Sequence, residues 1–384
     1  MPDARDRFVP GAVESHMSKT LAWLSIVVAL SGCSAADTLD FYWQGAAGQM
    51  DLITRARPIP EVIEQGGDAA LAARLDRVRD IRAFASRELG LPDNGSYTKY
   101  TELGRPFVLW NVFATPALSL KPRQWCFPVA GCVNYRGYFR EEDARAEAVR
   151  IRSEGDDVYV SGVPAYSTLG WFDDPVLSSF VRWPDTEVAR LIFHELAHQV
   201  LYVKDDTAFN ESFAVAVEEA GLARWLAVQR NPVLDAQALR AQLLRTAFRA
   251  MTRDARGKLA AIYASDIGDD AKRHAKVRTF ADMKAAYEQA KAGDPGLAGF
   301  ERWFAQEPNN ANLAALGLYS DRVPAFRVLL QEQGNDLSRF YERVRTLAVM
   351  PRTERDAVLT AAASRAPHLA GAAAAVAVPS PAHN

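Results

Sequence analysis

Two histidines four positions apart, His194 and His198, constrain the fold of this chain more than any other feature of its sequence. In an α-helix, residues i and i+4 lie one above the other, so both imidazoles converge on one point only if the segment is helical. Glu195 follows the first histidine and completes an H-E-x-x-H pattern. Oxygens at Asp185 and Thr186 are expected to cap the start of the helix, and apolar residues recur after them at helical spacing. The pattern therefore predicts a metal-binding helix.

A catalytic zinc ion needs a third protein ligand and keeps one coordination position open for water. The other histidines, at positions 16, 274, 368 and 383, lie in an N-terminal leader, a charged helix or the tail, so a carboxylate is the more economical ligand. We assign this role to Glu211, because the residues between His198 and Glu211 suffice to end one helix, turn, and send a second helix back alongside. Thr207 or Asp206 can cap that second helix. The alternative third ligands are Glu218, Asp205 and Asp206.

Several segments of the chain form a recognisable set. They are His194–Gln199, Leu201–Val203, Asp206–Thr207, Phe209–Ala214, Glu218 and Arg224–Leu226, together with Tyr135–Phe139, Ala165–Phe172, Asp174–Pro175 and Asn309–Ala311. The Asn-Glu-x-Phe-Ala string at 210–214 resembles the third-ligand helix of gluzincin aminopeptidases. The whole set, from roughly residue 45 to 350, resembles the family of predicted bacterial aminopeptidases. This resemblance implies an aminopeptidase acting on peptide substrates.

The predicted mechanism assigns general-base catalysis to Glu195. This carboxylate takes a proton from the zinc-bound water as the water attacks a peptide carbonyl, and then passes the proton to the leaving amine. Zinc polarises the carbonyl oxygen. The developing oxyanion needs a second donor, and Tyr166, expected on a strand before the metal helix, or Tyr319 could supply a phenol.

Two residues are candidate substrate contacts. Glu218 lies seven residues after Glu211 and so on nearly the same helical face, where it could orient a histidine ring or bind the α-amine of a substrate. The alternative is an ordinary solvated acid. Asn310 stands beside Asn309 in one of the segments that carry the resemblance, and the alternative role of both residues is helix capping.

The N-terminal segment predicts export. Residues 17–32 contain Lys19 and then an apolar stretch from Leu21 to Leu30, which is the pattern of a signal peptide and is too short to span a bilayer comfortably. Residues 1–16 hold three acids, at positions 3, 6 and 14, which do not belong in a basic leader. We therefore interpret Met17 as the start and residues 1–16 as a mis-called extension.

The residues Leu30-Ser31-Gly32-Cys33 resemble the lipobox of bacterial lipoproteins, which implies a lipid on Cys33. By the same resemblance, Ser34 favours the outer membrane. We predict a lipid-anchored, periplasm-facing protein of the cell envelope. The alternatives are an uncleaved anchor or a buried apolar strand with a free cysteine.

The other two cysteines, Cys126 and Cys132, form an even pair in a compartment where disulfides persist. Pro128 and Gly131 between them permit a tight loop that brings the two Cα atoms within bonding range. A disulfide is therefore predicted, and two reduced core thiols remain the alternative.

Hydrophobic periodicity predicts one α+β domain over residues 33–364 with a small sheet and a mostly helical C-terminal part. The H-E-x-x-H motif and the family resemblance imply a zincin-like metallopeptidase, in which the small sheet covers the metal helix and the C-terminal part forms the other wall of the cleft. The alanine- and proline-rich residues 365–384 are predicted to be a disordered tail. Helices are expected at 41–89, with a break near Pro58 and Pro60, and at 141–153, 185–204, 207–229, 236–251, 272–292, 311–318 and 323–347. Strands are expected at 107–113 and 157–163, with 165–171 as an extension of the same sheet.

The composition agrees with a folded enzyme. The chain has 384 residues, 49% of them hydrophobic and 24% charged, which excludes wholesale disorder. A net charge of -2 without a run of one sign gives no nucleic-acid surface. Three functions stay open: an exopeptidase, an H-E-x-x-H endopeptidase acting on envelope proteins or cell-wall peptides, and a non-catalytic lipoprotein with structural zinc or none. Metal analysis separates the third from the others.

Overall fold

The computed structural model describes residues 40–127, 131–318 and 322–366. The chain divides into two compact units, Met1–Asp51 and Leu52–Asn384. In the first unit the described residues, 40–51, are helical, and the helix runs on to residue 55. The predicted signal peptide, Cys33 and the tail from residue 367 lie outside the described residues and stay predictions. No helix in the described part of the chain is long and apolar enough to cross a membrane.

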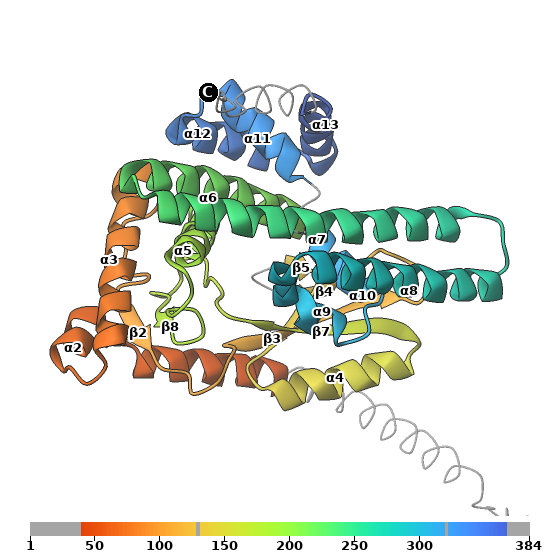
Figure 1. Ribbon diagram of the computed structural model, residues 1–384, viewed down its shortest axis with the longest axis horizontal. Coiled ribbons are helices and arrows are strands. Elements are labelled where there is room, and N and C mark those ends of the chain that lie inside the picture. The colour runs from red at the N-terminus through yellow and green to blue at the C-terminus, as the bar shows by residue number, and fades with distance from the viewer. Residues whose placement is uncertain (1–39, 128–130, 319–321, 367–384) are drawn as a thin grey trace, which may run out of the picture. The chain divides into compact units, whose positions relative to one another are not determined.

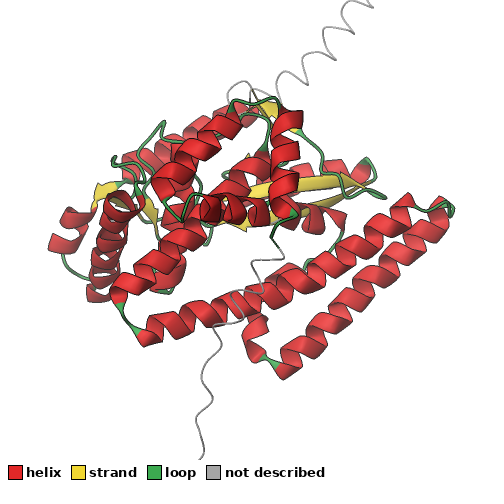
Figure 2. Ribbon diagram, turned by 90° about the horizontal axis from the view of Figure 1, so that it is seen from above, coloured by secondary structure: helices red, strands yellow, loops and turns green. Residues whose placement is uncertain are grey.

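The unit from Leu52 onward is an α+β structure in which helices outnumber the short strands (Figure 2). One sheet has the order β6-β3-β7 and is antiparallel throughout, a second has the order β1-β2-β8, and β4 and β5 form a hairpin. The strands are β1 (Arg57–Pro58), β2 (Lys99–Thr101), β3 (Leu109–Pro116), β4 (Trp125–Phe127), β5 (Gly131–Val133), β6 (Arg136–Tyr138), β7 (Asp156–Val163) and β8 (Val176–Leu177).

The hairpin of β4 and β5 places Cys126 directly opposite Cys132 in the strand register, and the two sulfur atoms are bonded to each other. The backbone amide of Cys132 also donates to the carboxylate of Asp205. The hairpin is therefore tied to the turn that precedes helix α6 (Thr207–Gln229).

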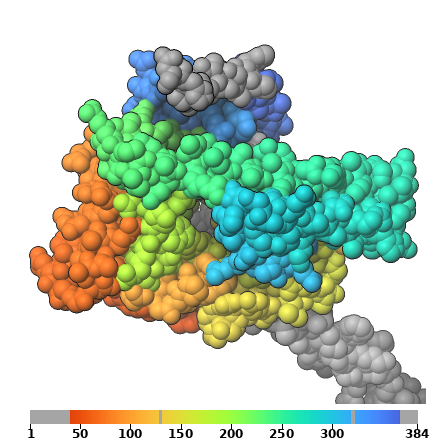
Figure 3. Space-filling view, viewed as in Figure 1, coloured from red at the N-terminus to blue at the C-terminus, as the bar shows by residue number. Residues whose placement is uncertain are grey.

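The helices carry most of the core. They are α2 (Ile59–Glu64), α3 (Ala69–Leu89), α4 (Glu141–Ser153), α5 (Asp185–Val200), α6 (Thr207–Gln229), α7 (Pro232–Ala264), α8 (Asp269–Gly293), the 3-10 helix η1 (Pro295–Phe300), α9 (Glu301–Phe304), α10 (Asn310–Leu318), α11 (Val323–Glu332), α12 (Leu337–Ala348) and α13 (Arg352–Ala363). In Figure 1, α7 and α8 form a long hairpin, and Figure 3 shows this hairpin projecting from the rest of the unit. The single helix predicted for 323–347 is two helices, because Gly334 and Asn335 have φ values of 68° and 58° and interrupt it.

Helices α5 and α6 pack against each other and make the most extensive contact of any helix pair among the described residues. Their packing requires a glycine at Gly221, because a Cβ there would lie 2.7 Å from Leu89 and 2.9 Å from Phe193. Helix α6 is anchored on its other side by Phe209 and Phe213, both fully buried, whose rings contact Phe326 at centroid distances of 5.1 Å and 6.2 Å. Aromatic pairs of this kind contribute about 0.5–1.5 kcal/mol each beyond burial.

The capping prediction is confirmed for α6 and wrong for α5. Asp206 accepts a hydrogen bond from the backbone amide of Phe209 and caps α6. The N-cap position of α5 is Pro184, which has no side-chain cap bond. Asp185 lies inside the helix and instead forms ion pairs with Arg74 and Arg77 of α3.

The predicted strand extension over residues 165–171 is also wrong. Strand β7 ends at Val163, immediately before Pro164. The following segment is a loop in which Leu169 and Gly170 have φ values of 57° and 81°, which an extended strand does not allow. Tyr166 therefore lies on a loop and not on a strand.

Candidate metal centre

The centre is built from two stripes of side chains on neighbouring helices. On α5, His194 and His198 are one turn apart and lie on the same face. On α6, Glu211 and Glu218 are two turns apart and face the histidines. Because Phe209 and Phe213 take the opposite face of α6 into the core, helical geometry leaves the Glu211 carboxylate directed towards α5.

Three ligand atoms converge at this point. The Nε2 atoms of His194 and His198 are 3.2 Å apart, and Oε2 of Glu211 lies 3.2 Å from the first and 3.7 Å from the second. These three residues are the group in the described part of the chain whose donor atoms could hold a metal ion, all lying within 4.8 Å of one another. Two imidazoles and a carboxylate are a donor set that zinc prefers.

The hydrogen bonds behind His194 fix its tautomer. Nδ1 of His194 lies 3.0 Å from Oε2 of Glu218, and since an ionised carboxylate only accepts, Nδ1 carries the proton. In the neutral ring, Nε2 of His194 then presents a lone pair towards the carboxylate of Glu211 and the second imidazole. When Nδ1 of His198 also carries the proton of its ring, the two Nε2 atoms and the carboxylate oxygen are acceptors at close range that a cation between them would satisfy, so the residues present fit a bound metal ion.

In the metal-free centre, the positive charge that the two carboxylates attract is a proton on His194. Burial disfavours a charged imidazole, but hydrogen bonds to Glu211 and Glu218 outweigh it and raise the pKa of His194 well above its ordinary value. Burial also disfavours a charged Glu211, yet the two histidines prevail and lower its pKa to about 2. The carboxylate is therefore ionised and ready to ligate a cation at neutral pH.

Glu195 lies within electrostatic range of this cluster. Burial, the largest effect, raises the pKa of its carboxyl group against the opposing influence of His194 and His198. The side chain is half-buried and has no hydrogen-bond partner among the residues that the structure describes. An unengaged carboxylate with a raised pKa beside a metal centre has the properties of a general base.

Glu218 lies behind the centre, where it contacts two residues of α5. It is buried, accepts from His194, and accepts from Nε of Arg190 at 2.8 Å. Each oxygen of the Glu218 carboxylate thus has a partner on α5, Oε1 with Arg190 and Oε2 with His194. This arrangement fits the orienting of the histidine ring better than the binding of a substrate amine. The sequence patterns did not lead us to Arg190 as a partner of Glu218, although it precedes His194 by the same four residues that separate the two histidines.

Three tyrosines of the described residues have raised pKa values near the centre, among them Tyr166, whose role stays a prediction. Burial, followed by Asp174, raises the pKa of Tyr166, whose ring packs on Phe139. Tyr135 is half-buried, and burial, followed by Glu211, raises the pKa of its phenol, with Glu195 also contributing. The charges of Glu211 and Glu195 therefore act on Tyr135, whereas the charge of Asp174 acts on Tyr166. Tyr319 lies outside the described residues.

The remaining candidates serve structural roles. Asn310 is fully buried, its Nδ2 donates to the carbonyl of Ala117, and its Oδ1 accepts from the hydroxyl of Tyr263, so no polar side-chain atom is left for a substrate. Asp206, an alternative third ligand, is committed to capping α6 and to an ion pair with Arg355. Asp205, another alternative third ligand, accepts a hydrogen bond from the backbone amide of Cys132.

A loop ties down the end of α5 that carries the second histidine. Gln199 accepts from Nδ2 of Asn94 at 2.7 Å and donates to the hydroxyl of Ser96 at 3.1 Å. The next residue, Tyr97, is buried, its hydroxyl lacks a partner among the described residues, and burial followed by the Glu195 charge raises its pKa. Asn94 and Ser96 therefore hold the end of α5, and Tyr97 lies within electrostatic range of Glu195, an arrangement that no local sequence pattern indicated.

Comparison with known protein families identifies the family of this chain. Comparisons with curated proteins and with solved structures gave no match. A comparison with protein-family models matched most of the chain, including both helices of the metal centre and the loops that flank it. We conclude that the chain belongs to the family described as "Putative aminopeptidase", whose model it matches over residues 40–359.

Proposed function

We propose that this protein is a zinc-dependent aminopeptidase with a zincin-like catalytic centre. The observation that carries the proposal is the convergence of Nε2 of His194, Nε2 of His198 and Oε2 of Glu211 on one point. Family membership supports peptidase activity on peptide substrates. The α5–α6 pair with a small antiparallel sheet in the same unit supports the zincin-like assignment.

In this proposal His194, His198 and Glu211 hold the zinc ion. When bound, zinc would act as a Lewis acid and lower the pKa of a water molecule to about 7. Glu195 takes the proton from the attacking water and returns it to the nitrogen of the leaving amine. The raised pKa of Glu195 suits both steps, because the group must accept and then release a proton near neutral pH.

Tyr135 is the proposed second donor to the oxygen of the tetrahedral species. A phenol with a raised pKa stays protonated and can donate a hydrogen bond where negative charge develops. The hydroxyl of Tyr135 has no hydrogen-bond acceptor among the described residues, so it is available for this role. Glu218 and Arg190 act behind His194, where they hold the ring in the ligating tautomer.

A substrate-blocking experiment tests the aminopeptidase assignment. The zinc-loaded protein is expected to release aniline from amino-acid anilides with a free α-amine and to leave the N-acetylated forms intact. Treatment with a chelator should abolish the activity, and added zinc should restore it. Cleavage of N-acetylated peptides at internal bonds would instead establish an endopeptidase, and zinc retention with no cleavage of either substrate set would favour a structural site.

Loss of the Glu218 carboxylate is expected to weaken zinc binding without removing any ligand. Glu218→Gln breaks the charged contact with Arg190 and loosens the orientation of His194, and the loss of such an outer partner costs roughly 10- to 100-fold in metal affinity. Competition with a chromogenic chelator measures the change. The matched control is Glu142→Gln on α4, whose side chain is 77% exposed. Equal zinc affinity in both variants would contradict the orienting role.

A further inference from the structure

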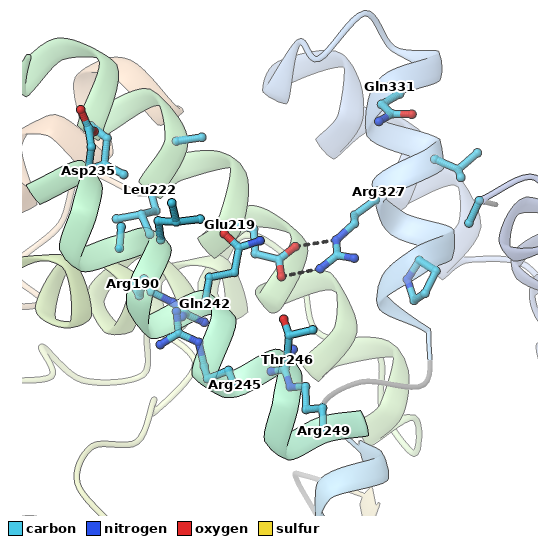
Figure 4. A pocket seen from close by; sticks show the side chains of 17 residues that line it. Arg190, Glu219, Leu222, Asp235, Gln242, Arg245, Thr246, Arg249, Arg327 and Gln331 are labelled. Carbon is cyan, nitrogen blue, oxygen red and sulfur yellow. Dashed lines mark hydrogen bonds and ion pairs between the residues drawn. The ribbon is translucent and has the colours of Figure 1, made fainter. Parts of the chain in front are cut away.

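A cavity lies between α6, α7 and α11, and none of the three candidate metal ligands lines it. Its volume is about 600 Å³, which is in the range of small-molecule sites. Figure 4 shows side chains from all three helices directed into it. Helix α7 supplies one continuous face, with Ala238, Gln242, Arg245 and Arg249 following each other at intervals of three or four residues.

The cavity changes character from one end to the other. Arg190, Arg245 and Arg249 gather at one end, whereas Leu222 and Asp235 lie at the other (Figure 4). Apolar side chains of α6, α7 and α11 also line the cavity, among them Leu226, Leu239 and Val328. Leu239 is 57% exposed, which is unusual for a large apolar residue and leaves hydrophobic surface at the rim.

Most of the charges in the cavity are already paired. Arg245 forms an ion pair with Glu187 at 3.0 Å, and Arg327 forms one with Glu219 at 2.6 Å. Arg190 is engaged by Glu218. The carboxylates close to these arginines are therefore occupied by partners.

Arg249 differs from these three arginines. Its side chain is half-buried, and within the described part of the chain it has no hydrogen-bond or ion-pair partner. It also borders a smaller cavity that reaches His194, so its guanidinium lies in the wall between the two cavities. Glu218 and Glu219 act on Arg249 only at longer range. A partly desolvated guanidinium without a hydrogen-bonded anion is an unfavourable arrangement that a bound carboxylate would relieve.

We propose that this cavity binds a small molecule in which a carboxylate adjoins an apolar chain, with the carboxylate on Arg249 and the chain along Leu222, Leu226 and Leu239. A fatty acid and the C-terminus of a short peptide both have this chemistry. The site does not depend on the proposed peptidase activity. Arg190 also lines the cavity, and it is two contacts away from His194, through Glu218.

Calorimetric titration of the full chain with paired probes tests the proposal. The first pair is octanoate and octanamide, and the second is acetyl-leucyl-leucine and its C-terminal amide, with Glu195→Gln as the host so that no bond is cut. Each carboxylate that binds should bind more tightly than its amide. Binding of octanoate alone identifies a lipid-derived ligand, binding of the peptide alone identifies a peptide terminus, and either result supports the site.

Two variants locate the carboxylate. Arg249→Gln is expected to weaken carboxylate binding about tenfold or more, because it removes a charge-assisted hydrogen bond. The matched control is Arg253→Gln, one turn further along α7, exposed and outside this cavity. If Arg249→Gln does not fold, the difference in affinity between each carboxylate and its amide, measured in the Glu195→Gln host, still tests whether the cavity binds a carboxylate. Absence of carboxylate binding, equal binding of acid and amide, or equal affinity in both variants overturns the proposal.

Discussion

Replacement of Glu195 by glutamine is expected to lower kcat/KM for an unblocked amino-acid anilide by a factor of roughly 100 to 10,000, the usual contribution of a general acid–base group. Glutamine has nearly the same shape but cannot accept the proton of the attacking water. Glu195 has no hydrogen-bond partner among the described residues, so its replacement disturbs no network. Steady-state kinetics of parent and variant, both loaded with zinc, measure the effect.

Zinc content separates loss of the base from loss of the metal. Glu195 is not among the three ligating residues, so Glu195→Gln should bind one zinc ion as the parent does. The exposed control Glu142→Gln should keep parental activity, because surface substitutions of this kind have small effects. A zinc-loaded Glu195→Gln protein that cleaves at the parental rate would exclude this residue as the base.

Removal of the Glu211 side chain is expected to abolish tight zinc binding. Glu211→Ala keeps both imidazoles, whose Nε2 atoms are 3.2 Å apart in the parent, but it loses the carboxylate that balances the charge of a divalent ion. The loss should exceed the roughly 10- to 100-fold cost of losing an outer-shell partner, and activity should fall with it. Zinc quantification after gel filtration and a chelator competition measure both the stoichiometry and the affinity.

The same experiment distinguishes Glu211 from the other acids considered as third ligand. Asp205 and Asp206 have their own partners in the turn before α6. Zinc bound by Glu211→Ala with parental affinity would require a ligand that the structure does not place at the centre. Far-ultraviolet circular dichroism confirms that the variant is folded, since Phe209 and Phe213 should still anchor α6.

The metal residues could be predicted from sequence because their positions depend on local regularities. His194 and His198 need only the helical period, and Glu211 needs in addition a turn short enough to bring a second helix back. Arg190 follows from the same period, one turn before His194, and could have been identified. The central parts of β3 and β7 were predicted from β-branched and aromatic runs.

The other residues of the site depend on tertiary packing. Tyr97 and Tyr135 lie on connecting segments that come near Glu195 only after the helices and sheet have assembled, and no spacing rule relates them to the metal helix. Asp185 is a residue type that often caps helices, but Arg74 and Arg77 of α3 form ion pairs with it instead. Asn310 was chosen from the family resemblance, which indicates that a segment matters without saying whether its role is structural or catalytic.

X-ray absorption at the zinc edge of the zinc-loaded protein tests the central claim most directly. The proposed centre predicts one zinc ion per chain, with two imidazole nitrogens at about 2.0–2.1 Å, oxygen atoms in the remaining positions and no sulfur. The spectrum should lose this signature in Glu211→Ala. A coordination shell that contains sulfur or lacks imidazole, or a chain that takes up no zinc, would contradict it.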